Sequence, residues 1–280
     1  MPKVIVYDSS TANAVSSTYI LYEQLPGRSL HSIWGGLNAA QRESAAREVA
    51  GLLKGLAGLR NKCPGAVSVR NTVFDFKRDV VRVDEMSLLS EPTVGGDGDV
   101  PALAGPMSTK ELLLDLARHQ RSNVGKVGAV PGCDGVWMRV EGMIHSLHEK
   151  GVVKGSDPFS LHHPDLSADN VLLSVINSHT VKLTGVLSWE NALFAPKFLG
   201  MQVPQFLQTG CQGNDSKGSV GVLTAFEEEM GKKWCRVAYQ PEMGLARKLW
   251  ELLVNGMNSS SHVFAAEEVL DKFEKMGVRG

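Results

Sequence analysis

The spacing of apolar and polar residues near the start of the chain predicts two β-strands. Residues 3–7 and 18–23 are rich in β-branched and aromatic side chains, which favour strands. A stretch of mostly small, polar residues (DSSTANAVSS) separates them and is typical of a turn, and Pro26-Gly27 then interrupts the chain. We therefore expect a short β region that ends near residue 27.

From Asn38 onward, apolar residues recur at helical spacing. Asn38 and Gln41 have the spacing of a capping box, in which each side chain bonds the backbone N–H of the other residue, and Ser108 and Glu111 repeat it. We expect a helix after each of these pairs. The same periodicity predicts helix over 136–150 and from Gly218 onward, with an interruption at 255–261.

Between the last two helical regions lies a compact segment with a different pattern. Residues 161–170 (LHHPDLSADN) are polar and predict a loop, and 171–174 (VLLS) predict a short strand. The turn-forming residues 177–179 (NSH) separate this strand from a second one over 181–189 (VKLTGVLSW). We expect a loop followed directly by a β-hairpin.

Length and composition narrow the class of protein. The chain has 280 residues, 43% of them hydrophobic, which is enough for one large domain or two lobes with a buried core. Its 29 Lys and Arg residues nearly balance its 30 Asp and Glu residues, whereas a nucleic-acid binder usually carries a basic stripe. The chain lacks a run of about 18 apolar residues, so we expect no transmembrane helix.

The cysteines and the first residues of the chain indicate the cellular compartment in which we expect the protein. A disulfide framework needs a small chain dense in cysteine, whereas the four cysteines here are far apart and form no CxxC pair. The opening MPKVIVY has neither the length of a secretory signal nor the Arg-rich character of a transit peptide. We expect a reduced, intracellular protein. The cysteines are Cys63, Cys133, Cys211 and Cys235.

The clearest chemical motif is HPDLSADN at 163–170, with the spacing H-x-D-L-x-x-x-N. Phosphoryl transfer from a nucleotide needs a base that accepts the proton of the attacking hydroxyl and ligands that hold the metal–phosphate complex in line. An Asp followed five residues later by an Asn supplies both on one loop. We expect Asp165 to be the base, Asn170 a magnesium ligand and His163 a hydrogen-bonding residue of the loop. The alternative is that Asp165 only braces the loop.

The segment LHHPDLSADNVLLS…KLTGVLSWENALFAPKFL resembles the catalytic core of the aminoglycoside phosphotransferase (choline kinase-like) superfamily, which has a protein-kinase-like fold. Residues 7–34 and 189–207 are similar to its fungal branch, in particular to the altered inheritance of mitochondria protein 9 group. The resemblance implies an α+β protein that is mainly the helical large lobe of that fold, with a remnant of the β small lobe.

The resemblance also implies a division of the chain and a set of ligands. Residues 1–27 would be the small-lobe remnant and hinge, and 28–280 the large lobe, with a catalytic-type loop at 161–174 and a hairpin at 171–190. ATP and Mg²⁺ would be the cofactors and a small-molecule hydroxyl the acceptor, with no nucleic-acid partner and an open oligomeric state. Localisation would be cytoplasmic or, by the resemblance, mitochondrial.

The hinge and the metal site follow from the same resemblance. Backbone groups near Glu23 and Leu25 would face the adenine ring. The second hairpin strand of the family ends in an Asp that binds magnesium, whereas this chain has Ser188 there, in LSWEN. A neutral hydroxyl is a weaker magnesium ligand than a carboxylate, so we expect impaired catalysis. Glu190 lies two residues on and, if the strand continues, on the same face, where it would replace the lost carboxylate.

A second departure concerns the small lobe. In protein kinases a glycine-rich loop covers the phosphates, and a strand Lys paired with a helix Glu holds them. Here the hinge-like strand is reached by residue 23, and Lys3 does not have the position of that Lys. We therefore expect a chain truncated at its N-terminus relative to the family. Three functions stay open: an impaired phosphotransferase, a non-catalytic pseudokinase-like binding or scaffold protein, and a fragment of a longer enzyme.

Three weaker motifs are interpreted as structural. Residues 213–219 have the glycine spacing of a phosphate-binding loop but no Lys before the Ser. Residues 95–99 (GGDGD) lack the ligand spacing of an EF-hand. His145 and His148 lie three residues apart on a predicted helix without an evident third metal ligand. We expect two solvated loops and two ordinary histidines.

Overall fold

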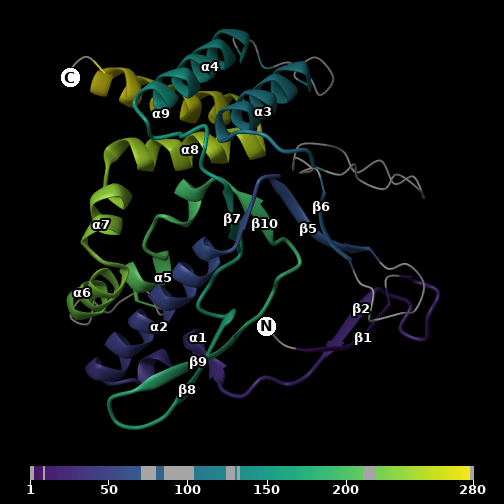
Figure 1. Cartoon of the computed structure of the whole chain (residues 1–280), viewed down its shortest axis with the longest axis vertical. Helices are drawn as coiled ribbons and strands as arrows, with labels where there is room; N and C mark the ends of the chain where they lie inside the picture. The colour runs from purple at the N-terminus through teal and green to yellow at the C-terminus, as the bar shows by residue number, and fades with distance from the viewer. Residues whose placement is uncertain are drawn as a thin grey trace. The chain divides into compact units, whose positions relative to one another are not determined.

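The computed structural model (Figure 1) describes most of the chain, with gaps. The described residues are 3–8, 10–70, 80–84, 104–123, 130, 133–210 and 219–277. They divide into two compact units, each assembled from separate stretches of the sequence. Unit 1 contains Met1–Gly55, His163–Asn191 and Val203–Lys232, and unit 2 contains Leu56–His162, Ala192–Gln202 and Lys233–Gly280.

Unit 1 holds the N-terminal strands, the first long helix and the loop–hairpin segment. Its elements are β1 (Val4–Asp8), β2 (Tyr19–Tyr22), β3 (Arg28–Ser29), α1 (Leu30–Ile33), η1 (Trp34–Gly36), most of α2 (Ala39–Gly58), β8 (Val171–Val175), β9 (Val181–Val186), α5 (Gln205–Gln208) and α6 (Ser219–Met230). The first two predicted strands are confirmed as β1 and β2, which pair antiparallel. A second sheet has the order β3-β8-β9, so the chain just after Pro26 adds a strand to the predicted hairpin.

Helix α2 begins at the predicted capping box. The Asn38 N–H donates to Oε1 of Gln41 and the Gln41 N–H donates to Oδ1 of Asn38, both at 3.0 Å. These bonds satisfy N–H groups that have no partner within the first turn of a helix. Glu48 on α2 accepts the Leu183 N–H at 2.9 Å, so the helix is fixed to strand β9. The fully buried side of α2 includes Ala45, Ala46, Val49 and Ala50.

Unit 2 consists of a sheet of short strands and a group of helices. Its strands are β4 (Arg60–Asn61), β5 (Gly65–Arg70), β6 (Val80–Asp84), β7 (Phe159–His162) and β10 (Leu193–Ala195), in the order β4-β7-β10-β5-β6. Its helices are α3 (Thr109–Asn123), α4 (Cys133–Glu149), η2 (Lys197–Gly200), α7 (Lys232–Ala238), α8 (Pro241–Asn255) and α9 (Ser260–Gly277). The break between α8 and α9 confirms the interruption predicted at 255–261.

Helix α3 begins at the second predicted capping box. The Ser108 N–H donates to Oε2 of Glu111 at 2.6 Å, and the Glu111 N–H donates to Oγ of Ser108 at 3.2 Å. Because these bonds to Ser108 favour the ionised carboxylate, they lower the pKa of Glu111 below its ordinary value. Helix α4 is also confirmed, although it begins at Cys133 rather than at 136.

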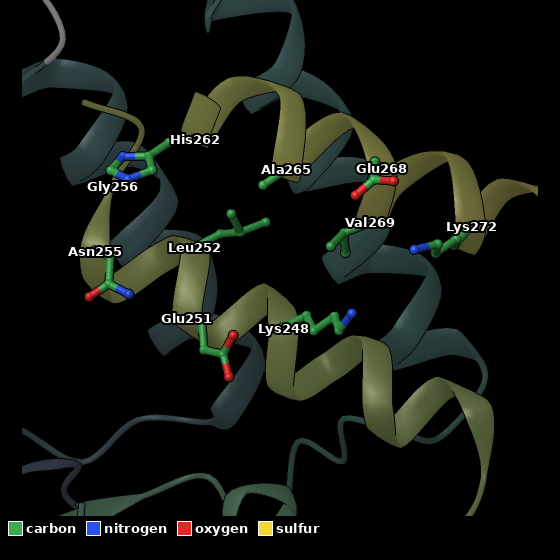
Figure 2. A pocket seen from close by; sticks show the side chains of 10 residues that line it. All are labelled: Lys248, Glu251, Leu252, Asn255, Gly256, His262, Ala265, Glu268, Val269 and Lys272. Atoms are coloured by element: carbon green, nitrogen blue, oxygen red, sulfur yellow. The ribbon is translucent and has the colours of Figure 1, made fainter. Parts of the chain in front are cut away.

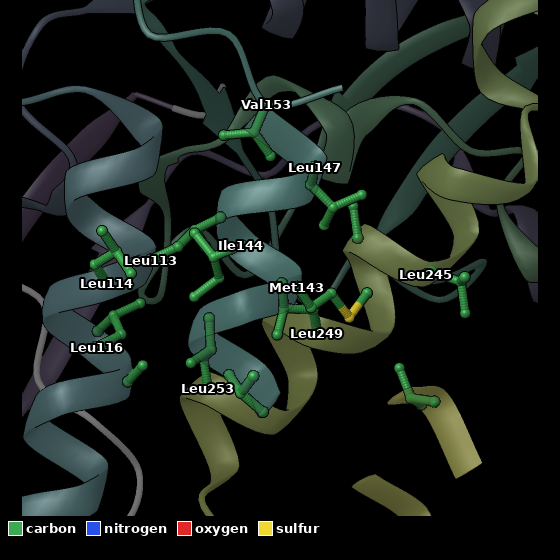
Figure 3. Close-up of a cluster of buried hydrophobic side chains, with 14 of the residues drawn as sticks. Leu113, Leu114, Leu116, Met143, Ile144, Leu147, Val153, Leu245, Leu249 and Leu253 are labelled. Carbon is green, nitrogen blue, oxygen red and sulfur yellow. The ribbon is translucent and has the colours of Figure 1, made fainter. Parts of the chain in front are cut away.

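The core of unit 2 is built from apolar faces of α3, α4, α8 and α9 (Figure 3). The buried residues of α4 recur at helical spacing, and Ile144 and Leu147 have no exposed surface. They are Cys133, Val136, Trp137, Val140, Met143, Ile144 and Leu147. They pack with α8, where Leu249 and Leu253 are also fully buried. Each such aliphatic side chain stabilises the fold by about 1.5–3 kcal/mol. This packing explains why periodicity alone located these helices.

Two boundaries around the hairpin were predicted wrongly. Residues 161–162 are not part of the loop, because they pair with β10 as the end of β7. The second hairpin strand ends at Val186 rather than at 189, and Ser188 has a φ of 62°, outside the extended region. The weaker motifs at 95–99 and 213–218 lie outside the described residues.

Four further predictions concern the two histidines of α4, metal sites, membrane-spanning helices and the division of the chain. Nδ1 of His148 lies 2.8 Å from the Val153 carbonyl, and His145 is exposed. Among the described residues, no group of three or more His, Cys, Asp or Glu side chains is arranged to hold a metal ion. None of the helices described is long and apolar enough to cross a membrane. The division into 1–27 and 28–280 stays a prediction.

Candidate functional site

The predicted base and the predicted metal ligand are in direct contact. The Asn170 Nδ2 group donates hydrogen bonds to Oδ2 and to the backbone carbonyl of Asp165, both at 2.8 Å. The same carbonyl accepts the Ser167 N–H at 2.9 Å, which closes the turn between the two residues. The side chain of Asp165 is exposed to solvent. The H-x-D-L-x-x-x-N spacing thus brings the carboxylate and the amide together at one exposed point of the loop.

Ser188 completes this arrangement from the end of the hairpin. Its hydroxyl donates to Oδ1 of Asn170 at 3.0 Å, and the Leu187 N–H donates to the Asn170 carbonyl at 2.9 Å. Ser188 is also one of two non-glycine residues with positive φ in the described chain. A left-handed conformation costs a residue other than Gly about 1–2 kcal/mol. The surrounding hydrogen bonds hold Ser188 in place despite this cost.

His163 joins the loop to the same stretch of backbone. It is 2% exposed, and its Nε2 lies 2.8 Å from the carbonyl of Leu187. Because a carbonyl only accepts hydrogen bonds, Nε2 is the donor in this contact. The ring also meets Trp189 edge-on, with 4.7 Å between centroids, and the Trp189 Nε1–H donates to the Val186 carbonyl at 2.8 Å. His163 thus contacts the end of the hairpin through its ring, and its role in the loop stays a prediction.

The hinge-like segment packs directly on the hairpin. A Cβ added to Gly185 would lie 2.2 Å from Cδ1 of Leu25, so a larger residue at this strand position requires the Leu25 side chain to move. Gly27 has a φ of +94°, and its added Cβ would lie 2.6 Å from the carbonyl oxygen of Leu173. The Thr184 hydroxyl donates to the Pro26 carbonyl. These contacts place residues 25–27 against β8 and β9.

Among the described residues, Glu23 and Glu190 form no hydrogen bond with the group around Asn170. The Glu23 N–H donates to the Lys3 carbonyl at 2.9 Å, and its exposed side chain accepts the Lys3 N–H at 3.1 Å. Glu190 is exposed and, in the described part of the chain, has no hydrogen bond or ion pair to Asn170 or Asp165. The predicted metal role of Glu190 required a strand that continues to residue 190. Strand β9 ends at Val186, so that requirement is not met.

The donor set around Asn170 does not fit magnesium as it stands. Mg²⁺ prefers carboxylate oxygens in octahedral geometry. The group offers one carboxylate, from Asp165, together with an amide oxygen and a hydroxyl. The amide oxygen of Asn170 already accepts a hydrogen bond from Ser188. The side chains are therefore bonded to one another and present a single negative charge.

Sequence reasoning located the polar residues of the site but missed the contacts that position them. The Leu187 carbonyl carries no signal in the sequence, because any residue supplies the same group. Gly185 does carry one, since an isolated glycine inside a strand often marks close approach of another part of the chain. Its partner Leu25 lies 160 positions earlier in the chain, as their residue numbers show, so only the folded structure identifies it.

Comparison with known proteins sets this geometry in context. No protein-family model matches the chain. Subtelomeric hrmA-associated cluster proteins from two strains of Aspergillus fumigatus are each 22% identical to it over 253 residues. These matches cover 74% of the chain and 49% of each relative, so the chain spans about half the length of the curated relatives it matches.

A solved structure is more informative about the fold. The ADP-bound aminoglycoside phosphotransferase APH(2'')-Ib aligns with 96% of this chain and 74% of its own, with a TM-score of 0.51 and 14% sequence identity. The chain has a protein-kinase-like fold of the aminoglycoside phosphotransferase type. The predicted fold class is thus confirmed: a mixed α and β protein, mainly the helical large lobe with a remnant of the β small lobe.

Proposed function

We propose that this protein is an impaired relative of the phosphotransferases, in which ATP-dependent transfer of a phosphoryl group to a small-molecule hydroxyl is slow. One observation carries the proposal. By the resemblance, Ser188 has the position at which the family carries a metal-binding carboxylate. The Ser188 hydroxyl donates its hydrogen to Oδ1 of Asn170. The oxygen that would bind magnesium is thereby engaged within the protein.

The expected size of the defect follows from the chemistry of the transition state. Phosphoryl transfer depends on positioning and on electrostatic stabilisation of charge on the phosphate oxygens. Replacing the carboxylate by the hydroxyl of Ser188 removes one negative charge that would hold the metal. Loss of several kcal/mol of such stabilisation lowers the rate roughly a thousandfold or more.

Asp165 retains part of what a catalytic base needs. Its Oδ2 is fixed by Asn170 Nδ2, whereas Oδ1 has no hydrogen-bond partner among the described residues. A positioned base of this kind typically contributes about 10²–10⁴-fold to a rate. We infer that Oδ1 would accept the proton of an acceptor hydroxyl, with Asn170 keeping the carboxylate in orientation.

A second candidate is a non-catalytic, pseudokinase-like binding or scaffold protein. The same closed group of Asp165, Asn170 and Ser188 favours it, because all three side chains form hydrogen bonds with one another without a ligand. Backbone groups near Glu23 and Leu25 would in either case face an adenine ring, and the structural neighbour with bound ADP supports this by analogy.

The proposal also covers which molecule accepts the phosphoryl group, where the protein is located and how long the whole protein is. The neighbour is named for aminoglycosides, and for this chain we propose only a small-molecule hydroxyl. The relation to the altered inheritance of mitochondria protein 9 group, the truncation at the N-terminus and the cytoplasmic or mitochondrial localisation stay predictions.

A thermal-shift measurement separates the two candidates. For an impaired enzyme, ATP raises the unfolding temperature more with Mg²⁺ than with EDTA, and Asn170→Ala removes this difference. For the non-catalytic protein, Mg²⁺ adds nothing to the shift that ATP causes. No shift at millimolar ATP under either condition would contradict nucleotide binding altogether. Glu190→Gln is the matched control, because its exposed side chain does not contact Asn170.

A further inference from the structure

A groove lies between helices α8 and α9 in unit 2, separate from the residues of the candidate site. Its volume is about 270 Å³ (Figure 2). The residues of its lining that matter here are Lys248 and Leu252 from α8 and Ala265, Glu268, Val269 and Lys272 from α9. Ala265 has a small side chain, so a larger residue at this position would extend into the groove.

The lining combines an apolar floor with charges of both signs. Leu252 and Val269 supply the floor, and Val269 is 7% exposed. Figure 2 shows Lys248 reaching from α8 and Lys272 from α9 towards the same end of the groove, with Glu268 close to that end. In the described part of the chain, these three charged side chains form no ion pair or hydrogen bond. Glu251 also belongs to the lining, and Figure 2 shows its carboxylate away from this end. Two ammonium groups and one carboxylate are thus available to a ligand at the end near Lys272.

We propose that this groove binds a small apolar α-amino acid in its zwitterionic form. The carboxylate of the ligand lies between the ammonium groups of Lys248 and Lys272, and its ammonium group pairs with Glu268. The aliphatic side chain lies on Leu252 and Val269. The volume is near the lower end for ligand pockets, about 300 Å³, which excludes larger amphipathic molecules. The proposal does not depend on the proposed phosphotransferase function.

The ligand class is tested with the full chain and four probes in calorimetric titrations. L-norleucine carries all three features, hexanoate lacks the ammonium group, pentylamine lacks the carboxylate and glycine lacks the aliphatic side chain. Norleucine is expected to bind in a saturable way. Hexanoate and pentylamine should bind more weakly by about twofold to fivefold, the range of one exposed ion pair. Glycine should bind at least about tenfold more weakly, because it buries no aliphatic chain. Equal binding of norleucine and hexanoate would overturn the role of Glu268. Absence of saturable norleucine binding would overturn the site.

Variants place the binding in the groove. Glu268→Gln and Lys272→Gln should each weaken norleucine binding, and Ala265→Leu should abolish it by filling the groove. Glu267→Gln and Lys275→Gln are matched controls, because these exposed residues of α9 do not line the groove. Controls that weaken binding as much as the groove variants would overturn the location. Because Glu268 is exposed, Glu268→Gln should keep the fold, which circular dichroism checks.

Discussion

The hydroxyl of Ser188 lies 3.0 Å from Oδ1 of Asn170 and donates a hydrogen bond to it. Asn170 in turn donates to the carboxylate of Asp165, so three side chains from the loop and the hairpin end form one hydrogen-bonded chain. A carboxylate in place of Ser188 would only accept hydrogen bonds, and so does Oδ1 of Asn170, so the two groups could not bond to each other. The serine therefore changes the group from one that needs a cation to one that is satisfied by itself.

The first prediction concerns Ser188→Asp. Without metal this variant should be less stable by about 1–3 kcal/mol, because Asn170 Oδ1 loses its donor and faces a negative charge. Asp tolerates the left-handed backbone at this position, so strain is not the cause. With Mn²⁺ and ATP present, electron paramagnetic resonance should show metal binding at least about tenfold tighter than in the wild type.

Ser188→Asn is the control for this variant, since it has nearly the size of Asp without its charge. It should not gain metal affinity. Metal binding by Ser188→Asp that equals that of the wild type would show that residue 188 does not face the metal position.

The second prediction concerns the contact between the hinge-like segment and the hairpin. Gly185→Ala should lower the free energy of unfolding by about 1–3 kcal/mol, because its Cβ would overlap Cδ1 of Leu25. Adding Leu25→Ala should restore part of this loss, with a coupling energy of about 0.5–3 kcal/mol in urea unfolding. Gly51→Ala, where an added Cβ meets nothing within 4 Å, should be neutral or stabilising. Additive losses in the double variant would contradict the contact.

The third prediction concerns acid stability of the helical core. Arg139 on α4 donates to Asp271 on α9 at 2.7 Å, and this bond lowers the pKa of Asp271 below its ordinary value of 3.8. Because the folded state favours the ionised carboxylate, the contribution is complete above the ordinary pKa and disappears as the pH falls through the lowered one. Urea midpoints of the wild type should therefore decrease more than those of Arg139→Gln as the pH falls from about 5 to about 2.

Arg118→Gln is the matched control for the acid series. Arg118 pairs with Asp115 within a single helix, and both side chains are mostly exposed. This variant should follow the wild type at every pH. If Arg139→Gln lost as much stability on acidification as the wild type, the pair between α4 and α9 would not contribute to the pH dependence.

Features determined by neighbouring residues could be predicted from the sequence. The two capping boxes, Asn38 with Gln41 and Ser108 with Glu111, are complete within four residues, and both form the predicted hydrogen bonds. The apolar stripe of α4 was equally evident, because the buried face of a helix repeats every three or four residues. Local chemistry is sufficient for such elements.

Features determined by distant residues could not be predicted. Strand β4 has two residues and β10 three, too few for an alternating pattern. Strand β4 pairs with β7, and β10 lies between β7 and β5, which are distant in the sequence. The early end of β9 reflects the positive φ of Ser188, a residue type that gives no local signal for that conformation. The motif spacing at Asp165 and Asn170 was informative, but the bond that closes the group comes from 18 positions later.

Turnover of Mg²⁺–ATP by the wild type and by Ser188→Asp, measured side by side, tests the central claim most directly. If phosphoryl transfer is impaired by the missing carboxylate, Ser188→Asp should turn over ATP at least about tenfold faster than the wild type, because a restored metal ligand stabilises charge in the transition state. Asp165→Asn should lower the rate again in the Ser188→Asp background, because Asp165 is the proposed base. Equal rates for the wild type and Ser188→Asp would contradict the account.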